Sequence, residues 1–403
     1  MFAPLKHPNF RLLWAGMSLS YAGDRLQELA QGWIVATLTG SAMAVGWIGI
    51  LSSIGMLMMP LGGVIADQAD QRRILLLGQW CGALFTGGMA VLAFTGSIAV
   101  WQIYLWALVS GLVWMVVRPA YKVIVTRAVP PDEIRPAVSL NSITETSAIV
   151  AINVGGSALL GWLGLPLAFI LNALSYLAAV FCLKRMHWTG RPPGAESHAF
   201  NLARLMTELK DGIRYLASKK ELLYPLLLTF GSIVLSSPCS SLLAAIVRRQ
   251  GGSILQLGLL GGAASLGALL GAVYAGTKSE GDPLRTYPLW GLAAAGAVCL
   301  FTFSPLGVLG ALGLAGLGFL AFSQAVWNTS RVPALALPGY QARLQALTSM
   351  AFTLGAPLGA AWGGVTVDRF GLTALLAGAA LLALASLGVL LWHTKIRRLK
   401  SLR

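Results

Sequence analysis

The sequence predicts an all-α polytopic membrane protein whose twelve transmembrane helices form two pseudo-symmetric six-helix halves. Three observations support this prediction: the composition, the recurrence of long apolar segments, and an internal repeat. Hydrophobic residues make up 56% of the 403 positions, charged residues only 11%, and the mean hydropathy is +0.73. Soluble globular domains of this length do not normally show such values.

Apolar segments long enough to cross about 30 Å of hydrocarbon as helices recur along the whole chain. We expect twelve spans, at 12–38, 42–65, 74–96, 100–120, 138–162, 165–183, 223–246, 254–276, 286–304, 306–328, 344–366 and 372–393. A tight turn at Gly40 separates the first span from the second.

The basic residues set the expected orientation of these spans. With the N-terminus in the cytoplasm, all but four of the 29 Lys and Arg residues fall in cytoplasmic segments or at their membrane edges; the exceptions are Arg25, Arg248, Arg249 and Arg369. The positive-inside rule therefore predicts cytoplasmic N- and C-termini. Anionic lipid at the inner surface then accounts for the net charge of +15, and we expect no nucleic-acid partner.

An internal repeat divides the chain into two halves. A shift of 208 residues, the separation of Gly63 and Gly271, also aligns Pro130 with Pro338, Arg135 with Arg343, and 155–156 with 363–364. We therefore expect an N-terminal half at 1–183, a cytoplasmic linker at 184–222 and a C-terminal half at 223–403, the halves being parallel repeats.

The first span carries charged side chains near its middle, where each ionised group costs roughly 2.5–3.5 kcal/mol and normally faces a cavity or a partner. Helical spacing places its polar residues on one face: Ser20, Asp24, Gln27, Glu28 and Gln31. Arg25 either neutralises one of the two carboxylates within the helix or belongs with them to a proton or substrate site. Asp24 lies nearer the midplane and is the first candidate for proton coupling, followed by Glu28.

The loop between the second and third spans combines glycine, carboxylates and a pair of cations. Its marked residues are Gly63, Asp67, Asp70, Arg72 and Arg73. Arg can bond carboxylates bidentately, so we expect a gating latch at this helix junction. The pattern resembles the G-x-x-x-D loop and basic cluster of the major facilitator superfamily, and its D-x-x-D-x-R-R form resembles the branch of enterobactin exporters and macrolide efflux proteins.

Four further stretches resemble the same branch, in the order that the branch has them. They lie at 127–142, 168–175, 208–215 and 355–359. The resemblance covers essentially the whole chain and implies the major facilitator fold and secondary active export of a small organic molecule, such as an amphipathic drug or a siderophore. Ala151 and Ile152 stand where the branch often has Gly-Pro, a pair associated with antiporters, which weakens the export assignment.

The linker contains the only long polar stretch. After a Gly- and Pro-rich break at 190–194, apolar residues recur at helical spacing from Leu202 to Leu216 among basic ones. We expect an amphipathic helix along the inner membrane surface, with membrane lipid as its partner; recruitment of another protein is the alternative.

Several polar and aromatic side chains are candidates for the transport cavity. Glu145 is a third proton-coupling candidate, or a structural partner of Arg118 or Lys122. Arg118 itself either contacts an anion or extends to the inner interface. The substrate-cavity candidates are Arg25, Gln27, Gln31, Trp114, Asn141, Asn172, Ser236, Trp327 and Asn328. Polar residues of this kind also join transmembrane helices to one another, which is the structural alternative.

Enzyme and cofactor signals are lacking in the sequence. It has no Walker A loop and no nucleophile elbow, and its four cysteines show no metal-ligand spacing. We therefore expect neither an enzyme nor a cofactor, but a monomeric transporter in the bacterial inner membrane that moves a small-molecule substrate and is driven by the proton gradient. Uptake or facilitated diffusion by the same fold, or a non-cycling binding or channel protein, is the alternative.

Overall fold

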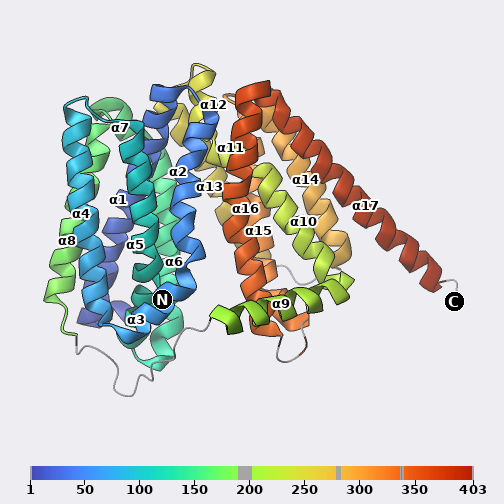
Figure 1. Cartoon of the computed structure of the whole chain (residues 1–403), viewed down its shortest axis with the longest axis horizontal. Helices are drawn as coiled ribbons and strands as arrows, with labels where there is room; N and C mark the ends of the chain where they lie inside the picture. Colours follow the sequence, from blue (N-terminus) through green and yellow to red (C-terminus); the bar gives the residue numbers. More distant parts are fainter. Residues whose placement is uncertain (1, 189–201, 278–282, 336, 338–339, 402–403) are drawn as a thin grey trace. The chain divides into compact units, whose positions relative to one another are not determined.

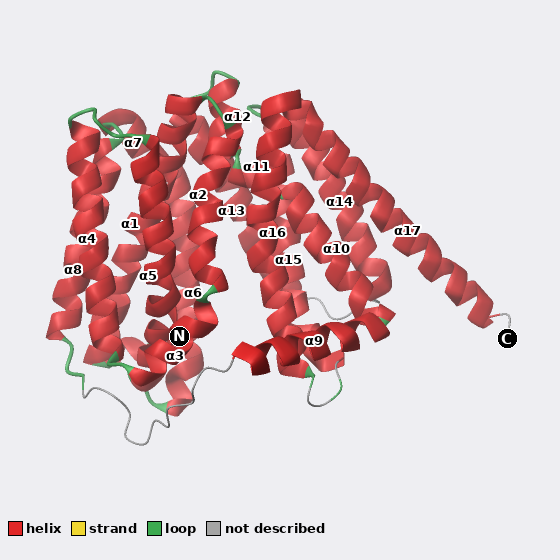
Figure 2. Ribbon diagram, viewed as in Figure 1, coloured by secondary structure: helices red, strands yellow, loops and turns green. Residues whose placement is uncertain are grey.

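The computed structural model describes residues 2–188, 202–277, 283–335, 337 and 340–401. These residues form helices and the loops between them, and none of them lies in a strand (Figures 1 and 2). The helices of the first half are α1 (Pro8–Thr39), α2 (Ala42–Leu57), α3 (Met59–Gln68), α4 (Gln71–Phe94), α5 (Val100–Arg127), α6 (Ile134–Ala151), α7 (Ser157–Leu163) and α8 (Pro166–Arg185). A π-helical turn, Ile152–Gly156, joins α6 to α7, and short 3-10 turns lie at Ala3–Lys6 and Pro131–Glu133.

The second half begins with α9 (Leu202–Ser218). It continues with α10 (Lys220–Ser236), α11 (Pro238–Ser241), α12 (Leu243–Arg249), α13 (Ile254–Thr277), α14 (Pro283–Phe303), α15 (Val308–Leu335), α16 (Gln341–Phe370) and α17 (Leu375–Ser401), with a 3-10 turn at Leu372–Ala374. The predicted span positions agree with these helices, although α5 continues past Pro119 to Arg127 instead of ending near 120.

Ten helical segments of the described chain are long and apolar enough to cross a membrane, or eleven if the pair α2 and α3, bent by 47°, counts as one span. The bend follows from Pro60, which stands at the start of α3. The chain is therefore a multi-pass membrane protein. Helix α1 has 32 residues but carries Asp24, Arg25 and Glu28, which keep it outside the apolar set. The full count of twelve stays a prediction.

The helices group into two compact units. Unit 1 comprises Met1–Thr39, Leu51–Phe200 and Ser253–Gly258; unit 2 comprises Gly40–Ile50, Asn201–Gly252 and Leu259–Arg403. In unit 1, α8 packs against both α1 and α4. The unit 1 core is built from large apolar side chains that are fully buried, among them Phe10, Leu13, Leu75 and Ile124.

Two helices that correspond through the 208-residue repeat pack closely together in each unit. In unit 1, a Cβ on Gly55 of α2 would lie 1.8 Å from the carbonyl oxygen of Gly111 in α5; in unit 2, a Cβ on Gly267 of α13 would lie 1.9 Å from that of Ala315 in α15. The 208-residue shift relates α2 to α13 and α5 to α15. Small residues allow the backbones to approach in both places, although the contacting positions differ, since the shift relates Gly55 to Ala263 and Gly111 to Phe319.

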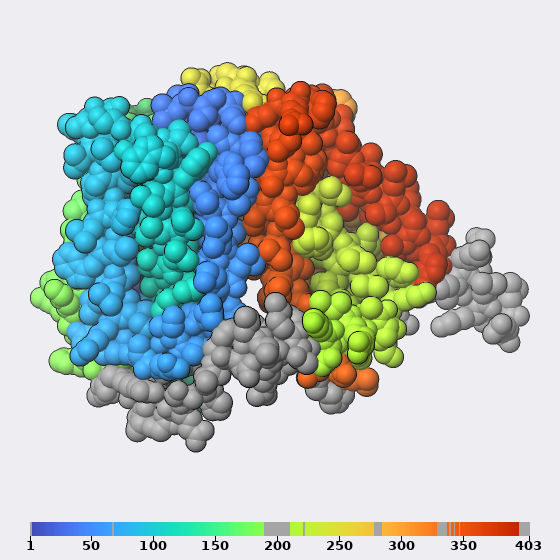
Figure 3. All heavy atoms as spheres, in the orientation of Figure 1, coloured from blue at the N-terminus to red at the C-terminus, as the bar shows by residue number. Residues whose placement is uncertain are grey.

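Helix α9 is present as predicted, and it belongs to unit 2. It packs against α10 and α16 and lies at the lower end of α16 in Figure 3. Leu216 is buried with Leu222 and Leu344, whereas Ile213 is 55% exposed. Its position on the membrane surface stays a prediction, and the expected break at 190–194 lies outside the described residues.

Candidate substrate and proton sites

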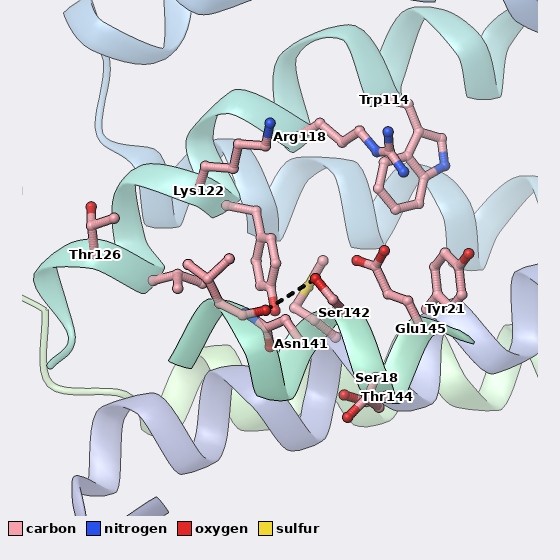
Figure 4. Close-up of a pocket in the computed structure, with 14 residues that line it drawn as sticks. Ser18, Tyr21, Trp114, Arg118, Lys122, Thr126, Asn141, Ser142, Thr144 and Glu145 are labelled. Carbon is pink, nitrogen blue, oxygen red and sulfur yellow. Dashed lines mark hydrogen bonds between the residues drawn. The ribbon is translucent and has the colours of Figure 1, made fainter. Parts of the chain in front are cut away.

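Unit 1 contains a pocket of about 450 Å³ bounded by α1, α5 and α6 (Figure 4). Pockets that hold small organic molecules have volumes of roughly 300–1,000 Å³. The aromatic side chains of Tyr21, Trp114 and Tyr121 line it, and three charged side chains, Arg118, Lys122 and Glu145, join them. The pocket therefore contains three residues predicted for the cavity or for coupling: Trp114, Asn141 and Glu145.

The two cations of the pocket come from one face of α5. Arg118 and Lys122 are four residues apart, which is about one helical turn. The Arg118 guanidinium lies 5.8 Å from the centre of the Trp114 ring, a cation–π distance. Neither cation forms an ion pair or a hydrogen bond with a described residue. No described carboxylate therefore pairs with Arg118 or Lys122, and both side chains are exposed.

Glu145 enters the same pocket from α6, and its carboxylate points toward Arg118 and Trp114 in Figure 4. It is partly buried and forms no ion pair within 4.0 Å among the described residues. A tight structural ion pair to Arg118 or Lys122, one of the alternatives above, is therefore not formed in this structure. Asn141, one turn before Glu145, has a buried Oδ1 atom without a hydrogen-bond donor.

Asp24 lies in a different environment, between α1 and α8. Tyr176 donates its hydroxyl proton to Asp24 Oδ1 at 2.5 Å, and Asn172 Nδ2 donates to the same oxygen at 3.1 Å. Asn172 also donates to Gln27 Oε1 at 2.7 Å. The second oxygen of Asp24 is buried and has no partner among the described residues. The structure thus joins Asp24, Gln27 and Asn172, three of the predicted site residues, in one buried network.

A separate polar contact joins α1 to α4. Ser20 donates its hydroxyl proton to Gln79 Oε1 at 2.9 Å, and both side chains are buried. Gln31, one further turn along α1, is also buried, and its amide nitrogen has no partner among the described residues. Ser20, Gln27 and Gln31 of the polar face of α1 are therefore turned into unit 1, as the sequence predicts, whereas Glu28 of the same face is exposed.

Arg25 and Glu28 pair with each other. Their ion pair is 2.5 Å long, and the Glu28 side chain is 58% exposed. The Arg25 guanidinium also lies 5.1 Å from the centre of the Tyr21 ring. Arg25 thus pairs with Glu28 within the helix, and Asp24 has uncharged partners. A role for Arg25 and Glu28 in a proton or substrate site stays a prediction.

The loop between α3 and α4 is held by bonds to the backbone. Asp70 accepts hydrogen bonds from the amides of Arg72 at 2.9 Å and Arg73 at 3.4 Å, which makes it the N-cap of α4. Arg72 donates to the carbonyl oxygens of Leu183 at 2.8 Å and Lys184 at 2.7 Å, at the end of α8.

The described contacts of this loop differ from a latch of Arg–carboxylate pairs. The only Arg–carboxylate pair described in this loop joins Arg73 to Asp70 at 3.6 Å, and the Arg73 side chain is 84% exposed. Gly63 lies within α3, where a Cβ would meet no atom within 4 Å. The side chain of Asp67 lies outside the described residues.

The candidates of unit 2 lie apart from a described pocket. Tyr287 donates to Asn328 Oδ1 at 2.9 Å, and Asn328 donates to Thr229 Oγ1 at 3.1 Å, all buried. The ring of Trp327 lies 4.7 Å from that of Trp290. Ser236 donates to the carbonyl oxygen of Ser232 in its own helix. The contacts of Asn328 and Trp327 join helices of unit 2 to one another, and a substrate role for Ser236, Trp327 and Asn328 stays a prediction.

Sequence reasoning missed a dense charged cluster in unit 2, at the end of α16. The Asp368 carboxylate accepts hydrogen bonds from the Ser41 hydroxyl at 2.6 Å and from the amides of Ala42 at 2.8 Å and Met43 at 3.0 Å, at the start of α2. It also pairs with Arg249. Arg249 donates further to the carbonyl oxygens of Gly40 at 2.8 Å and Val367 at 3.2 Å. The available signal was Arg249, one of four cations that depart from the positive-inside pattern.

No group of three or more His, Cys, Asp or Glu side chains suited to a metal ion is found among the described residues. The helical architecture, the repeat and the polar pocket together define a membrane transporter of the major facilitator type. A sequence model of the family described as "Transmembrane secretion effector" (MFS_3) matches residues 1–280, and the chain belongs to this family.

Comparisons with individual proteins agree with this membership. The enterobactin exporter EntS of Escherichia coli O1:K1 / APEC is 24% identical over 358 residues, which cover 88% of this chain and 84% of the exporter. A bacterial homologue of the iron transporter ferroportin, in its inward-facing state, has a TM-score of 0.67 at 15% identity and covers 94% of this chain and 98% of its own. The nucleoside transporter NupG has a TM-score of 0.65 at 15% identity, and the match covers 93% of this chain and 98% of NupG. The two solved structures show the fold alone.

Proposed function

We propose that the chain exports a small amphipathic organic molecule, drug-like or siderophore-like, across the bacterial inner membrane by alternating access in exchange for protons. The similarity to an enterobactin exporter supports export. The pocket between α1, α5 and α6 is the proposed substrate site. The observation that carries the proton exchange is the environment of Asp24, a buried carboxyl with two uncharged donors and one unpartnered oxygen.

Asp24 is the proposed coupling group because it can take up a proton without breaking an ion pair. Arg25, the nearest cation in sequence, is paired with Glu28. Burial of a charged carboxylate without an ionic partner is costly, and protonation removes that cost. Tyr176 and Asn172 of α8 contact the same oxygen, so the protonation state of Asp24 acts directly on the contact between α1 and α8.

The proton gradient supplies sufficient free energy for this exchange. Each proton that enters down a potential of 100 mV contributes about 2.3 kcal/mol. In the proposed topology both termini are cytoplasmic, α9 lies on the inner membrane surface, and the 184–222 segment links two six-helix halves. The protein acts as a monomer, its partners are the substrate and lipid, and no cofactor takes part.

The test is transport into inverted membrane vesicles with an imposed pH gradient, across a panel that includes a catecholate siderophore, a macrolide and a lipophilic cation. We expect Asp24→Asn to reduce proton-driven accumulation by about tenfold or more while retaining binding, because the amide keeps the shape but cannot cycle a proton. Glu28→Gln is the matched control: it neutralises a carboxylate one turn away that already has an ionic partner, and it should retain coupling.

Detergent-extracted yield of both variants separates loss of coupling from loss of folding. Intact proton coupling in Asp24→Asn would remove Asp24 from the mechanism. Movement of a substrate together with protons, in the same direction, would replace export by uptake.

A further inference from the structure

We propose that the pocket of unit 1 selects organic anions carrying an aromatic ring, and that Arg118 and Lys122 are the residues that impose this selection. The inference rests on the proposal that this pocket is the substrate site. It concerns the charge of the molecule that binds, whereas the proposed function concerns its direction and driving force.

The first step is the charge balance of the pocket. Its lining contains two cations and one carboxylate, and the cations make no ion pair with a described residue. Both cations are exposed and line the pocket, so a ligand that brings a negative charge gains Coulombic attraction there. Because Arg118 and Lys122 lie one turn apart on α5, a single carboxylate, sulfonate or phosphate group can contact both.

The second step is the shape of the wall beside the cations. Trp114 lies one turn before Arg118 on α5, and Tyr21 and Tyr121 line the same space. Aromatic walls favour flat rings through offset or edge contacts worth about 0.5–1.5 kcal/mol beyond the area buried. A ligand whose acidic group is attached to a ring therefore satisfies the cations and the aromatic wall at once.

The third step is the hydrogen-bonding capacity left to a ligand. Ser142 already donates to the carbonyl oxygen of Val138 at 3.1 Å, as Figure 4 shows, and Thr144 donates to that of Leu140 at 2.8 Å. The Oδ1 atom of Asn141 has no donor, but it is buried and, as an acceptor, does not bind an anion. The charged contacts open to an anionic group are thus those of Arg118 and Lys122.

The negative charge of Glu145 leads to a prediction opposite to that for the two cations. Its carboxylate points toward Arg118, so it attracts the same cation as the ligand and repels a ligand anion. Removal of this charge should strengthen the binding of anions, whereas removal of either cation should weaken it. A merely structural role for Arg118, in which it extends toward the inner interface, predicts neither effect on binding.

The experiment uses three probes that share a naphthalene ring system and differ in charge: anionic 1-naphthoate, neutral 1-naphthamide and cationic 1-naphthylmethylammonium. Equilibrium binding of each is measured by calorimetry on the purified full-length protein in lipid nanodiscs at neutral pH. We expect the wild type to bind naphthoate about tenfold or more tightly than naphthamide, and the ammonium probe least, because hydrogen bonds to charged groups are worth about twice those to neutral ones.

The variants test the assignment to residues. Arg118→Gln should lower the naphthoate-to-naphthamide preference by about tenfold, Lys122→Gln by a smaller factor, and Glu145→Gln should raise it several-fold. Arg135→Gln is the matched control, because Arg135 is an exposed cation of α6 outside the pocket lining. It removes the same charge and should leave the preference unchanged.

Equal binding of naphthoate and naphthamide, or an anion preference that survives both cation variants, would overturn the proposal. Should Arg118→Gln fail to fold, the opposed effects of Lys122→Gln and Glu145→Gln still decide it. The measurement uses no gradient: a failed anion preference with intact proton-driven transport would refute this inference alone. A clear preference without proton-driven transport would refute the exchange mechanism alone.

Discussion

Asp70 and Asp368 both place a carboxylate at the N-terminus of a helix, but Asp70 caps its own helix whereas Asp368 caps a helix that begins 326 residues earlier. In each case the carboxylate accepts hydrogen bonds from amides that have no partner within the helix and lies at the positive end of the helix dipole. The two sites differ in the further contacts of the arginine that pairs with each carboxylate. Arg73 of the Asp70 site is 84% exposed, whereas Arg249 of the Asp368 site also donates to two carbonyl oxygens.

A charged sequence motif and a charged structural junction therefore need not coincide. The loop around Asp70 contains a recognisable pattern of carboxylates and cations, yet its described bonds are mostly local. The Asp368 site joins the start of α2 to the ends of α12 and α16 through residues that lie far apart in the sequence. We therefore expect substitutions at Asp368 to affect stability more than those at Asp70.

Asp368→Ala should produce the largest effect. It removes the ion pair to Arg249 and three hydrogen bonds to the first residues of α2, and leaves the Arg249 guanidinium without its carboxylate. From the usual contributions of a charged hydrogen bond and a helix cap we expect a loss of about 3 kcal/mol. The apparent melting temperature in detergent, followed by tryptophan fluorescence, measures it.

Arg369→Gln provides the control for Asp368→Ala, since Arg369 is the next residue, is exposed and has no described ion pair. It should leave the melting temperature close to that of the wild type. Equal effects of the two substitutions would show that the cap contributes nothing to stability.

A double-mutant cycle measures the contribution of the Asp368–Arg249 ion pair separately from that of the helix cap. Asp368→Asn and Arg249→Gln each break the pair, so their combination should cost less than the sum of the single losses, with a coupling of about 1–2 kcal/mol. Urea-induced unfolding of the four proteins in mixed micelles gives the coupling. Additive losses would mean that Asp368 acts through the α2 amides alone.

Asp70→Ala should cost about 1 kcal/mol, the usual value for the loss of an N-cap side chain. Ser41 offers a comparison, because its hydroxyl accepts a hydrogen bond from the amide of Ala44 and so caps α2 from within its own segment. Asp70→Ser should therefore recover most of the loss, which thermal unfolding of both variants would measure. A loss at Asp70 as large as that at Asp368 would contradict the ranking of the two sites.

Those parts of the fold that depend on local composition could be predicted from the sequence, and those that depend on partners far along the chain could not. The long apolar segments placed the helices well, because span length follows from bilayer thickness. The polar face of α1 was likewise predicted from helical spacing. The partners of that face were not: Tyr176 lies 152 residues after Asp24, and no pattern in either segment indicates that they meet.

The same limit applies to the choice between neighbouring charges. Asp24, Arg25 and Glu28 share one helix, and sequence alone left open which carboxylate Arg25 would neutralise. Packing decides, because Asn172 and Tyr176 approach Asp24 from α8 while Glu28 is partly exposed and free to pair with Arg25. Contacts between helices, which no local spacing encodes, therefore give Asp24 and Glu28 different partners.

The smallest expected effect distinguishes two adjacent arginines that the motif treats alike. Arg73→Gln should change stability by less than about 0.5 kcal/mol, because its ion pair with Asp70 is 3.6 Å long and the side chain is largely solvated. Arg72→Gln should cost about 1–2 kcal/mol, because Arg72 donates to two carbonyl oxygens at the end of α8 that would otherwise lack a charged donor.

The two variants have the same composition and net charge, so any difference in their melting temperatures reports the bonds to α8 and not electrostatics at long range. Arg72→Lys adds a further distinction, since an ammonium group keeps the charge but cannot reproduce the forked contact with both carbonyls and should recover only part of the loss. Indistinguishable melting curves for Arg72→Gln and Arg73→Gln would show that the loop acts as an undifferentiated basic cluster, as its sequence motif suggests.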